Sequence, residues 1–564
     1  MKRRPFVLLT LAAVLVVVSA CVPATTPAPA PAPAATTVPA AKAPAEATKA
    51  PAEPAKAPAQ PTEAPKAAAA PTAAPAGGTT LRVGVGIDVN SLDPIAQNNT
   101  TVANMLSYML ETLVTFDKDG KIIPLLAKSW KNSDDGLEWT FTLQEGAKFH
   151  DGTPFDAAAV KANFDRLLDP ELTAPGRGSY TIIKSVEAVN PTTVKFTLNK
   201  RSMAFLSTLT WPASSFVSPA TIVKGSPTYK TITTPVGTGR YVFKELVKGS
   251  NLTATKNPNY WGKKPYYDTV TFRILPEAAT RESQLLAGQL DVIILPPASD
   301  LAALDKNPAV KLLLAPSNRA IFTAINTTKK PWDNPKARQA LNYAVNKDEI
   351  VKSILFDAGS TLDAPIAPSV FGYCKAGPYA YDPDKAKALL KEAGVAADTP
   401  VDLIYPTGRY LQDAQAGQAI GAFLTQVGLK PQMSTMDYPT YIASVTKPLT
   451  ETKTTLHMLG WASSYLDASG SMETFDSRLQ PPKGFNTAFY TNNKVNDLLD
   501  QALSEVDPTK RADLYCQAQK IVWEEAPWIF LWYQRFPIVH SAKIKNVGYL
   551  PNEMFTTFDA EPAQ

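Results

Sequence analysis

The sequence has little of what catalytic and metal-binding proteins require. It has three histidines, His150, His457 and His540, which stand far apart and outside any metal-ligand pattern such as H-E-x-x-H. It contains no G-x-S-x-G nucleophile turn and no G-x-x-x-x-G-K-[ST] phosphate loop. A catalytic triad built from distant residues would leave no such motif, so a hydrolase stays open as an alternative. The sequence favours a protein that is not an enzyme and holds no metal or cofactor.

Net charge is also low. The formal charge is +5 over 564 residues, and no basic motif concentrates it. A nucleic-acid-binding surface needs a positive field, so no nucleic-acid partner is expected. The chain also lacks an internal repeat and any long linker after Gly78. The part that follows Gly78 is therefore predicted to fold as one assembly of lobes.

The first 20 residues have the pattern of a signal peptide. Three cations, Lys2 to Arg4, precede an apolar run over Phe6–Ala20. This run is short for a membrane span, which needs about 20 apolar residues. It ends in Val18-Ser19-Ala20-Cys21, which resembles a bacterial lipobox. The resemblance implies lipidation of Cys21 and cleavage before it, and an ordinary cleavage site with an incidental cysteine is the alternative.

Residues 22–78 contain no aromatic side chain. Ala, Pro, Thr, Lys and Glu recur there without apolar periodicity. Such a segment cannot bury enough apolar surface to offset the entropy of ordering. Its proline density favours an extended, semi-rigid spacer. We predict a lipidated Cys21 followed by a disordered linker, together covering residues 21–78.

Two cysteines, Cys374 and Cys516, remain after the linker. An even pair in an exported protein predicts a disulfide. Two unrelated buried thiols are the alternative.

The remainder mixes strand and helix patterns. Apolar residues alternate over 81–85, 139–143 and 194–198, as in half-buried strands. Helices are predicted from Pro335 after a cap at Asn334, from Pro383 to a stop at Gly394, and along 495–503. The isolated pair Gly237 and Gly239 predicts a turn. The fold class is therefore α/β.

Aromatic residues gather in the last third of the chain. They are Trp461, Tyr465, Tyr490, Trp528, Trp532 and Tyr533. Ligand sites use aromatic walls with a few fixed polar groups. Most of these residues could equally belong to the core, and for Trp528 and Trp532 the core is preferred.

A series of ordered motifs begins in the stretch 126–167. This stretch contains a Trp, then S-x-D-G-L, a strand, F-x-D-G-T-P-F and a helix that ends in Arg. The residues are Trp130, Ser133, Asp135, Gly136, Leu137, Phe149, Asp151, Gly152, Thr153, Pro154, Phe155 and Arg166. Further motifs lie at 235–239, 257–261, 331–347, 381–386 and 460–461. Together these motifs resemble one family, the family 5 extracellular solute-binding proteins of bacterial ABC importers, and the resemblance covers nearly all of 79–559.

This resemblance implies a two-lobed periplasmic-binding-protein fold of type II, in the large peptide-binding form with an extra domain. The implied division is lobe I over 79–122, 233–316 and 529–564, the extra domain II over 123–232, and lobe III over 317–528. The implied mechanism is closure of the lobes on a ligand, followed by docking of the closed form on an ABC permease. The protein is expected to be a monomer.

Within this family, the C-terminal part looks most like the glutathione-binding members. The stretches 485–490, 507–508 and 515–529 carry this likeness. Many peptide-binding members have a Gly-Trp-x-x-Asp-Tyr stretch whose Asp pairs with the peptide ammonium. Here Ser464 holds the Asp position, between Trp461 and Tyr465, so Asp467 could supply the charge instead. A solvated loop position is the alternative for Asp467.

Arg409 follows a strand-like run, where the family often has a cleft-facing arginine. A guanidinium binds carboxylates bidentately, and a surface salt bridge is the alternative for this residue. The predicted ligand contacts are thus Trp461, Arg409, Ser464, Tyr465 and Asp467.

The function predicted by this resemblance is capture of a short peptide or glutathione outside the cytoplasmic membrane, or in a periplasmic space, for delivery to a permease. A ligand-binding receptor subunit for signalling is an alternative, as is binding of nickel complexes or sugars. A wall-anchored hydrolase is the third.

Overall fold

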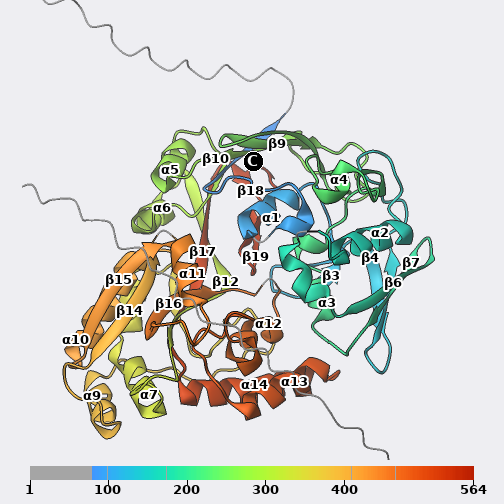
Figure 1. Cartoon of the computed structure of the whole chain (residues 1–564). Helices are drawn as coiled ribbons and strands as arrows, with labels where there is room; N and C mark the ends of the chain where they lie inside the picture. Colours follow the sequence, from blue (N-terminus) through green and yellow to red (C-terminus); the bar gives the residue numbers. More distant parts are fainter. Residues whose placement is uncertain (1–78, 98, 173, 408, 464, 564) are drawn as a thin grey trace, which may run out of the picture. The chain divides into compact units, whose positions relative to one another are not determined.

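The computed structural model describes residues 79–97, 99–172, 174–407, 409–463 and 465–563 (Figure 1). The chain divides into Met1–Ala74 and Pro75–Gln564, and the described residues all belong to the second unit. The predicted signal peptide, Cys21 and the linker lie outside the described residues. None of the described helices is both long enough and apolar enough to cross a bilayer.

A mixed sheet of eleven strands runs through the described part of the chain. In spatial order its strands are β15 (Lys430–Asp437), β14 (Pro400–Thr407), β16 (Leu456–Trp461), β12 (Val310–Ile325), β17 (Trp528–Ser541), β11 (Val292–Ile294), β1 (Thr80–Val85), β10 (Thr269–Ile274), β9 (Asn251–Lys256) and β8 (Tyr241–Val247), with β13 (Gly359–Thr361) also paired to β17. The predicted strand at 81–85 is confirmed as β1, which pairs in parallel with β10 and β11.

A separate four-stranded antiparallel sheet lies within residues 127–198. Its order is β4 (Ala127–Asn132), β5 (Glu138–Leu143), β7 (Thr193–Leu198) and β6 (Ile183–Asn190). β5 and β7 bury alternate residues, which confirms the two predicted strands. Helix α2 (Ala157–Leu168) packs on this sheet through Phe164, whose ring meets Phe196 edge-on at 4.9 Å between centroids.

The helices begin and end where capping chemistry allows. Asn334 caps α7 (Pro335–Ala344), Asp382 caps α9 (Pro383–Glu392), and Gly394 adopts a positive φ just beyond α9, all as predicted. The third predicted helix is α13 (Asn493–Ser504). The other α-helices are α1 (Thr100–Leu106), α3 (Phe205–Thr208), α4 (Pro227–Lys230), α5 (Ala278–Leu286), α6 (Leu301–Lys306), α8 (Lys347–Glu349), α10 (Asp413–Gln426), α11 (Tyr438–Val445), α12 (Ala468–Met472) and α14 (Pro508–Glu525).

Short two-stranded pairs complete the described strands. They are β2 (Val114–Phe116) with β3 (Ile122–Pro124), β18 (Ile544–Lys545) with β21 (Glu561–Pro562), and β19 (Gly548–Leu550) with β20 (Met554–Thr556).

Four large apolar clusters form the core. They are the β1 core around Val83, Phe272 and Ile538, the β5 core around Phe141, Phe164 and Phe196, the α7 core around Leu341, Ile420 and Trp532, and the α13 core around Leu498, Tyr515 and Trp528. Trp528 and Trp532 are thus core residues, as the sequence favoured.

Two long strands connect the β1, α7 and α13 cores. β12 and β17, of 16 and 14 residues, pair antiparallel from Val310 opposite Ser541 to Ala324 opposite Trp528. The pairing is irregular between Pro316 and Ala320. β17 gives Phe536 and Ile538 to the β1 core, and its earlier residues to the α7 and α13 cores. The sequence-based domain boundaries stay predictions. The clusters divide β17 between Tyr533 and Phe536 rather than at 528/529.

The sequence predicted a turn at Gly237 and Gly239, and the chain bends over residues 238–240. The two glycines also face the backbone of a distant segment. A Cβ at Gly237 would lie 2.1 Å from the Met109 carbonyl oxygen, and one at Gly239 would lie 2.6 Å from the Tyr108 oxygen. Main chain fills that space and cannot move aside as a side chain would. These glycines therefore allow two backbones to touch.

Cys374 precedes α9, and Cys516 lies in α14. The structure joins them by a disulfide with the Cα atoms 5.1 Å apart and 142 positions apart in sequence. A crosslink that closes so long a loop would stabilise the fold by about 4–5 kcal/mol in the chain-entropy account.

We predict that this disulfide forms in the native protein. Alkylation of the denatured, unreduced protein followed by peptide mapping should recover the Cys374 and Cys516 peptides crosslinked and unmodified. Alkylation of both cysteines before reduction would contradict the pairing.

Candidate functional site

Trp461 is the last residue of β16, and it is the first residue of that strand that is not fully buried. The five residues before it are buried, whereas Trp461 is half-buried. Its indole Nε1 donates to the Gly470 carbonyl at 2.9 Å, and its ring lies 4.9 Å from that of Phe485, which is 36% exposed. The two rings form a partly open apolar face.

Arg409 lies just beyond β14, and its side chain is exposed. The Arg409 backbone N–H donates to Asp413 Oδ2 at 2.8 Å, at the start of α10. Its guanidinium carbon lies 5.2 Å and 5.1 Å from the ring centroids of Tyr410 and Tyr438. Among the described residues, no carboxylate lies within ion-pair distance of this guanidinium. The group is held by aromatic faces and stays available to an anion.

The structure brings Arg409 and Trp461 into one neighbourhood. The Tyr410 hydroxyl donates to the Gly460 carbonyl at 3.3 Å, so the residues that adjoin Arg409 and Trp461 are bonded to each other. Trp461 also lies opposite Ala320 of β12, at the irregular part of that strand. The two predicted contacts therefore lie beside the β12–β17 pair.

A buried ion pair supports this neighbourhood. Arg319 donates to Glu553 through Nε at 3.0 Å and Nη2 at 2.6 Å, and the Ser317 hydroxyl donates to the same carboxylate at 2.8 Å. Burial raises the pKa of Glu553, but Arg319, with Ser317 and Arg409, outweighs burial and holds that pKa below its usual range. Glu553 is therefore a fixed anion between segments that are 234 positions apart.

Sequence reasoning missed this pair and the ring of Phe485. No motif or spacing in the sequence relates Arg319 to Glu553. The two residues are 234 positions apart and come into contact only in the folded protein, where β12 positions Arg319. Phe485 could have been suspected from its place in the 485–490 stretch, but nothing in that pattern relates it to Trp461.

The loop after Trp461 differs from the expectation. Ser464 lies outside the described residues. Tyr465 is half-buried, and its ring covers Gly470, where a Cβ would lie 3.0 Å from the ring. Asn318 Nδ2 donates to the Ser463 carbonyl at 2.7 Å, which ties the loop to β12.

Asp467 is neither a solvated loop residue nor a free charge. It is 2% exposed, and its Oδ1 accepts from Arg511 Nη2 at 2.6 Å and from the Ser469 backbone N–H at 3.0 Å. The carboxylate therefore caps α12 and neutralises a buried guanidinium. Its predicted contact with a ligand ammonium stays untested, but the acid is already bonded within the protein.

The histidines occupy structural positions. His150 exchanges hydrogen bonds with the 237–239 backbone, His457 bonds the Thr487 hydroxyl, and His540 bonds the Ser541 carbonyl. Burial lowers the pKa of all three, to about 3 for His457. The described residues also contain no cluster of His, Cys, Asp and Glu that could hold a metal.

We predict that Asp467→Ala lowers the free energy of unfolding by about 3–5 kcal/mol, because it leaves Arg511 buried and unpaired. Urea unfolding followed by tryptophan fluorescence measures this loss. Asp513→Ala is the matched control, since Asp513 is exposed and bonds Gln517 on the surface of α14. Equal stability of the two variants would contradict a structural role for Asp467.

Comparisons with known proteins identify the family of this chain. Residues 121–481 match the bacterial extracellular solute-binding proteins, family 5 Middle. The chain is 36% identical over 483 residues to the glutathione-binding protein GsiB of Escherichia coli O1:K1 / APEC, covering 85% of this chain and 94% of that protein.

Solved structures show the same fold. The periplasmic binding protein DppA from Helicobacter pylori, in complex with the peptide STSA, is 28% identical with a TM-score of 0.72, over 86% of this chain and 98% of that one. HbpA2 from Haemophilus parasuis is 27% identical with a TM-score of 0.76, over 86% of this chain and all of that one. These likenesses confirm the predicted α/β, two-lobed fold class. The chain belongs to the bacterial extracellular solute-binding proteins of family 5, whose members bind solutes and are not enzymes.

Proposed function

We propose that this protein captures a short peptide or glutathione outside the cytoplasmic membrane and delivers it to an ABC permease. The observation that carries the proposal is the free guanidinium of Arg409 beside the Trp461–Phe485 face. The names of the relatives support this ligand class, since one is a glutathione-binding protein and another was solved with a peptide.

The chemistry of the site suits a carboxylate attached to an organic body. A guanidinium forms two parallel hydrogen bonds with a carboxylate, and glutathione has two carboxylates. Glu553 already neutralises Arg319, so Arg409 contributes the additional positive charge of this neighbourhood. The aromatic face supplies contact area next to that charge. Ser464 and Tyr465 stay in the proposal as loop contacts, while Asp467 holds the loop in place.

Capture proceeds by closure. The predicted lobes are joined through β12 and β17, so a ligand that contacts both lobes stabilises the closed form over the open one. Only this difference in affinity between the two forms can drive closure. The closed form then docks on a permease that is a separate chain, and the binding protein acts as a monomer.

The proposed location is the outer face of the cytoplasmic membrane. Lipid on Cys21 would anchor the protein, because each buried CH₂ contributes about 0.8 kcal/mol and more than one acyl chain gives stable binding. Residues 22–78 would then separate the folded part from the bilayer.

We predict that Trp461→Ala weakens binding of glutathione by about 1–3 kcal/mol, the range for a lost aromatic anchor. Arg409→Ala should weaken ligands with a free carboxylate and leave the corresponding peptide amides nearly unchanged. Titration calorimetry of the full chain measures both effects. Lys391→Ala, which removes an exposed cation on α9, is the control for net charge. Wild-type affinity in both Trp461→Ala and Arg409→Ala would place the ligand elsewhere.

We predict that Cys21→Ala abolishes lipidation and releases the protein from the membrane fraction. Fractionation of cells that express each form, with mass spectrometry of the N-terminus, measures the outcome. If the variant stays in the membrane fraction to the same extent as wild type, the protein has another anchor.

A further inference from the structure

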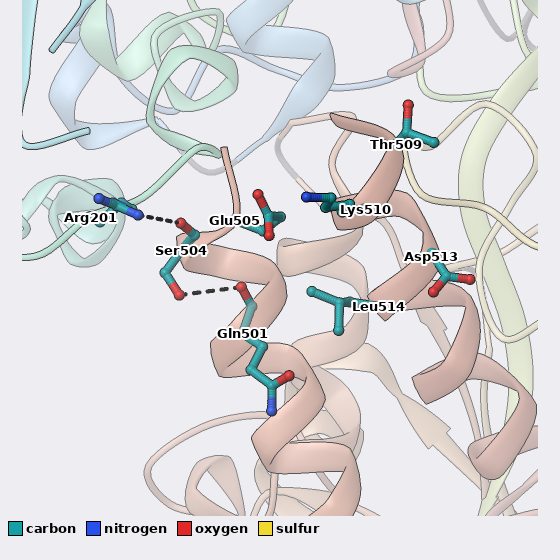
Figure 2. Close-up of a pocket in the computed structure, with 8 residues that line it drawn as sticks. All are labelled: Arg201, Gln501, Ser504, Glu505, Thr509, Lys510, Asp513 and Leu514. Atoms are coloured by element: carbon teal, nitrogen blue, oxygen red, sulfur yellow. Dashed lines mark hydrogen bonds between the residues drawn. The ribbon is translucent and has the colours of Figure 1, made fainter. Parts of the chain in front are cut away.

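The segment between β7 and α3 touches the C-terminal end of α13. The Met203 backbone N–H donates to the Leu503 carbonyl at 3.1 Å, and Arg201 Nη1 donates to the Ser504 carbonyl at 3.3 Å. Figure 2 shows the Arg201 side chain reaching Ser504 at the end of this helix. Both residues line a cavity of about 680 Å³. Ser504 is the last residue of α13, so both acceptors belong to its final turn.

The last four carbonyls of a helix lack partners within the helix and must find them elsewhere. In α13, the Gln501 carbonyl accepts from the Glu505 backbone N–H, and the Ala502 carbonyl accepts from Arg511 Nε. The remaining two carbonyls, at 503 and 504, accept from Met203 and Arg201. A guanidinium suits this position, because the C-terminal end of a helix carries partial negative charge.

Arg201 also contacts the turn at Asp135 and Gly136, and these contacts fix its side chain. Its Nε donates to the Asp135 carbonyl, and its stem lies against Gly136, where a Cβ would be 2.9 Å from Arg201 Cγ. Gly136 has a φ of +68°, so this turn needs glycine for its backbone as well as for the space. The S-x-D-G-L motif, singled out in the sequence, thus supports the side chain that crosses to α13.

The two sides of this contact belong to different cores. Met203 and Leu206 pack against the β5 core, whereas Leu498 of α13 is part of the α13 core. The contact therefore joins the predicted domain II to the predicted lobe III. Charged side chains of Glu505, Lys510 and Asp513 line the cavity beside it, so water can reach both carbonyls when the contact opens.

We propose that Arg201 and Met203 form a latch on the C-terminus of α13 that biases the protein toward its closed form without ligand. This inference rests on the proposed closure. A hydrogen bond that water can replace adds little net stability, so the latch opens reversibly. Because its acceptors are main-chain carbonyls, the latch is independent of the ligand's chemistry.

Hydrogen exchange at single amides in the ligand-free full chain tests the latch. The Met203 amide reports the contact, and the Leu198 amide, bonded to the Leu137 carbonyl within the four-stranded sheet, reports the domain itself. Arg201→Gln should speed exchange of the Met203 amide about three- to tenfold, as expected for the loss of one ordinary, water-replaceable hydrogen bond, and leave the Leu198 amide unchanged. Lys200→Gln is the matched control, because it removes a cation from an exposed neighbouring position.

Three results would overturn the latch. In the first, the Met203 amide exchanges equally in Arg201→Gln and Lys200→Gln. In the second, the Leu198 amide accelerates together with Met203, which means that the domain itself unfolds. In the third, the wild-type Met203 amide exchanges as slowly as Leu198, which means that the seam does not open. No ligand is added, so failure of glutathione to bind would leave this readout unaffected.

Discussion

The pairing of β12 with β17 is the constraint on which the rest depends. Each strand contributes residues to the cores at both of its ends, so neither end can be rearranged without moving the other. The pairing is irregular at 316–320, and there Ser317, Asn318 and Arg319 turn their polar groups to Glu553 and to the loop after Trp461. An interruption of the regular hydrogen bonding between two strands commonly changes the direction of the side chains there. The candidate site is built on that interruption.

Three buried ion pairs among the described residues join segments that are distant in the sequence. Asp93 bonds Arg166 at the end of α2, Arg319 bonds Glu553, and Asp467 bonds Arg511. Desolvation cancels much of the attraction in such pairs, so they are weak sources of stability. Loss of one partner is costly, because the other charge is left buried. Each pair therefore disfavours any arrangement of distant segments that separates its two charges. A site assembled from β12, β14 and β16 depends on such a fixed arrangement.

Local physics explains what could be predicted from the sequence. The alternation in β5 and the cap at Asn334 involve residues a few positions apart, so their pattern is visible in the chain. The partner of Asp467 lies 44 positions away, and that of Arg319 lies 234 away. Nothing in composition or spacing distinguishes a carboxylate that will meet such a partner from one that stays in water. The close approach of the glycines at 237 and 239 to the backbone at 108–109 could not be predicted for the same reason.

In the proposed closure, the contacts around α13 and the contacts of the ligand have different effects on the closed form. A latch that stabilised the closed form too strongly would prevent binding, because only protein molecules in the open form can take up ligand. The apparent affinity for ligand falls as the fraction of open molecules falls. Two replaceable hydrogen bonds to main-chain carbonyls avoid that outcome, since water substitutes for them in the open form. The deciding contribution must then come from groups that find a partner only when ligand is present. The guanidinium of Arg409, held by aromatic rings and without a described carboxylate partner, is the group that we propose for this role.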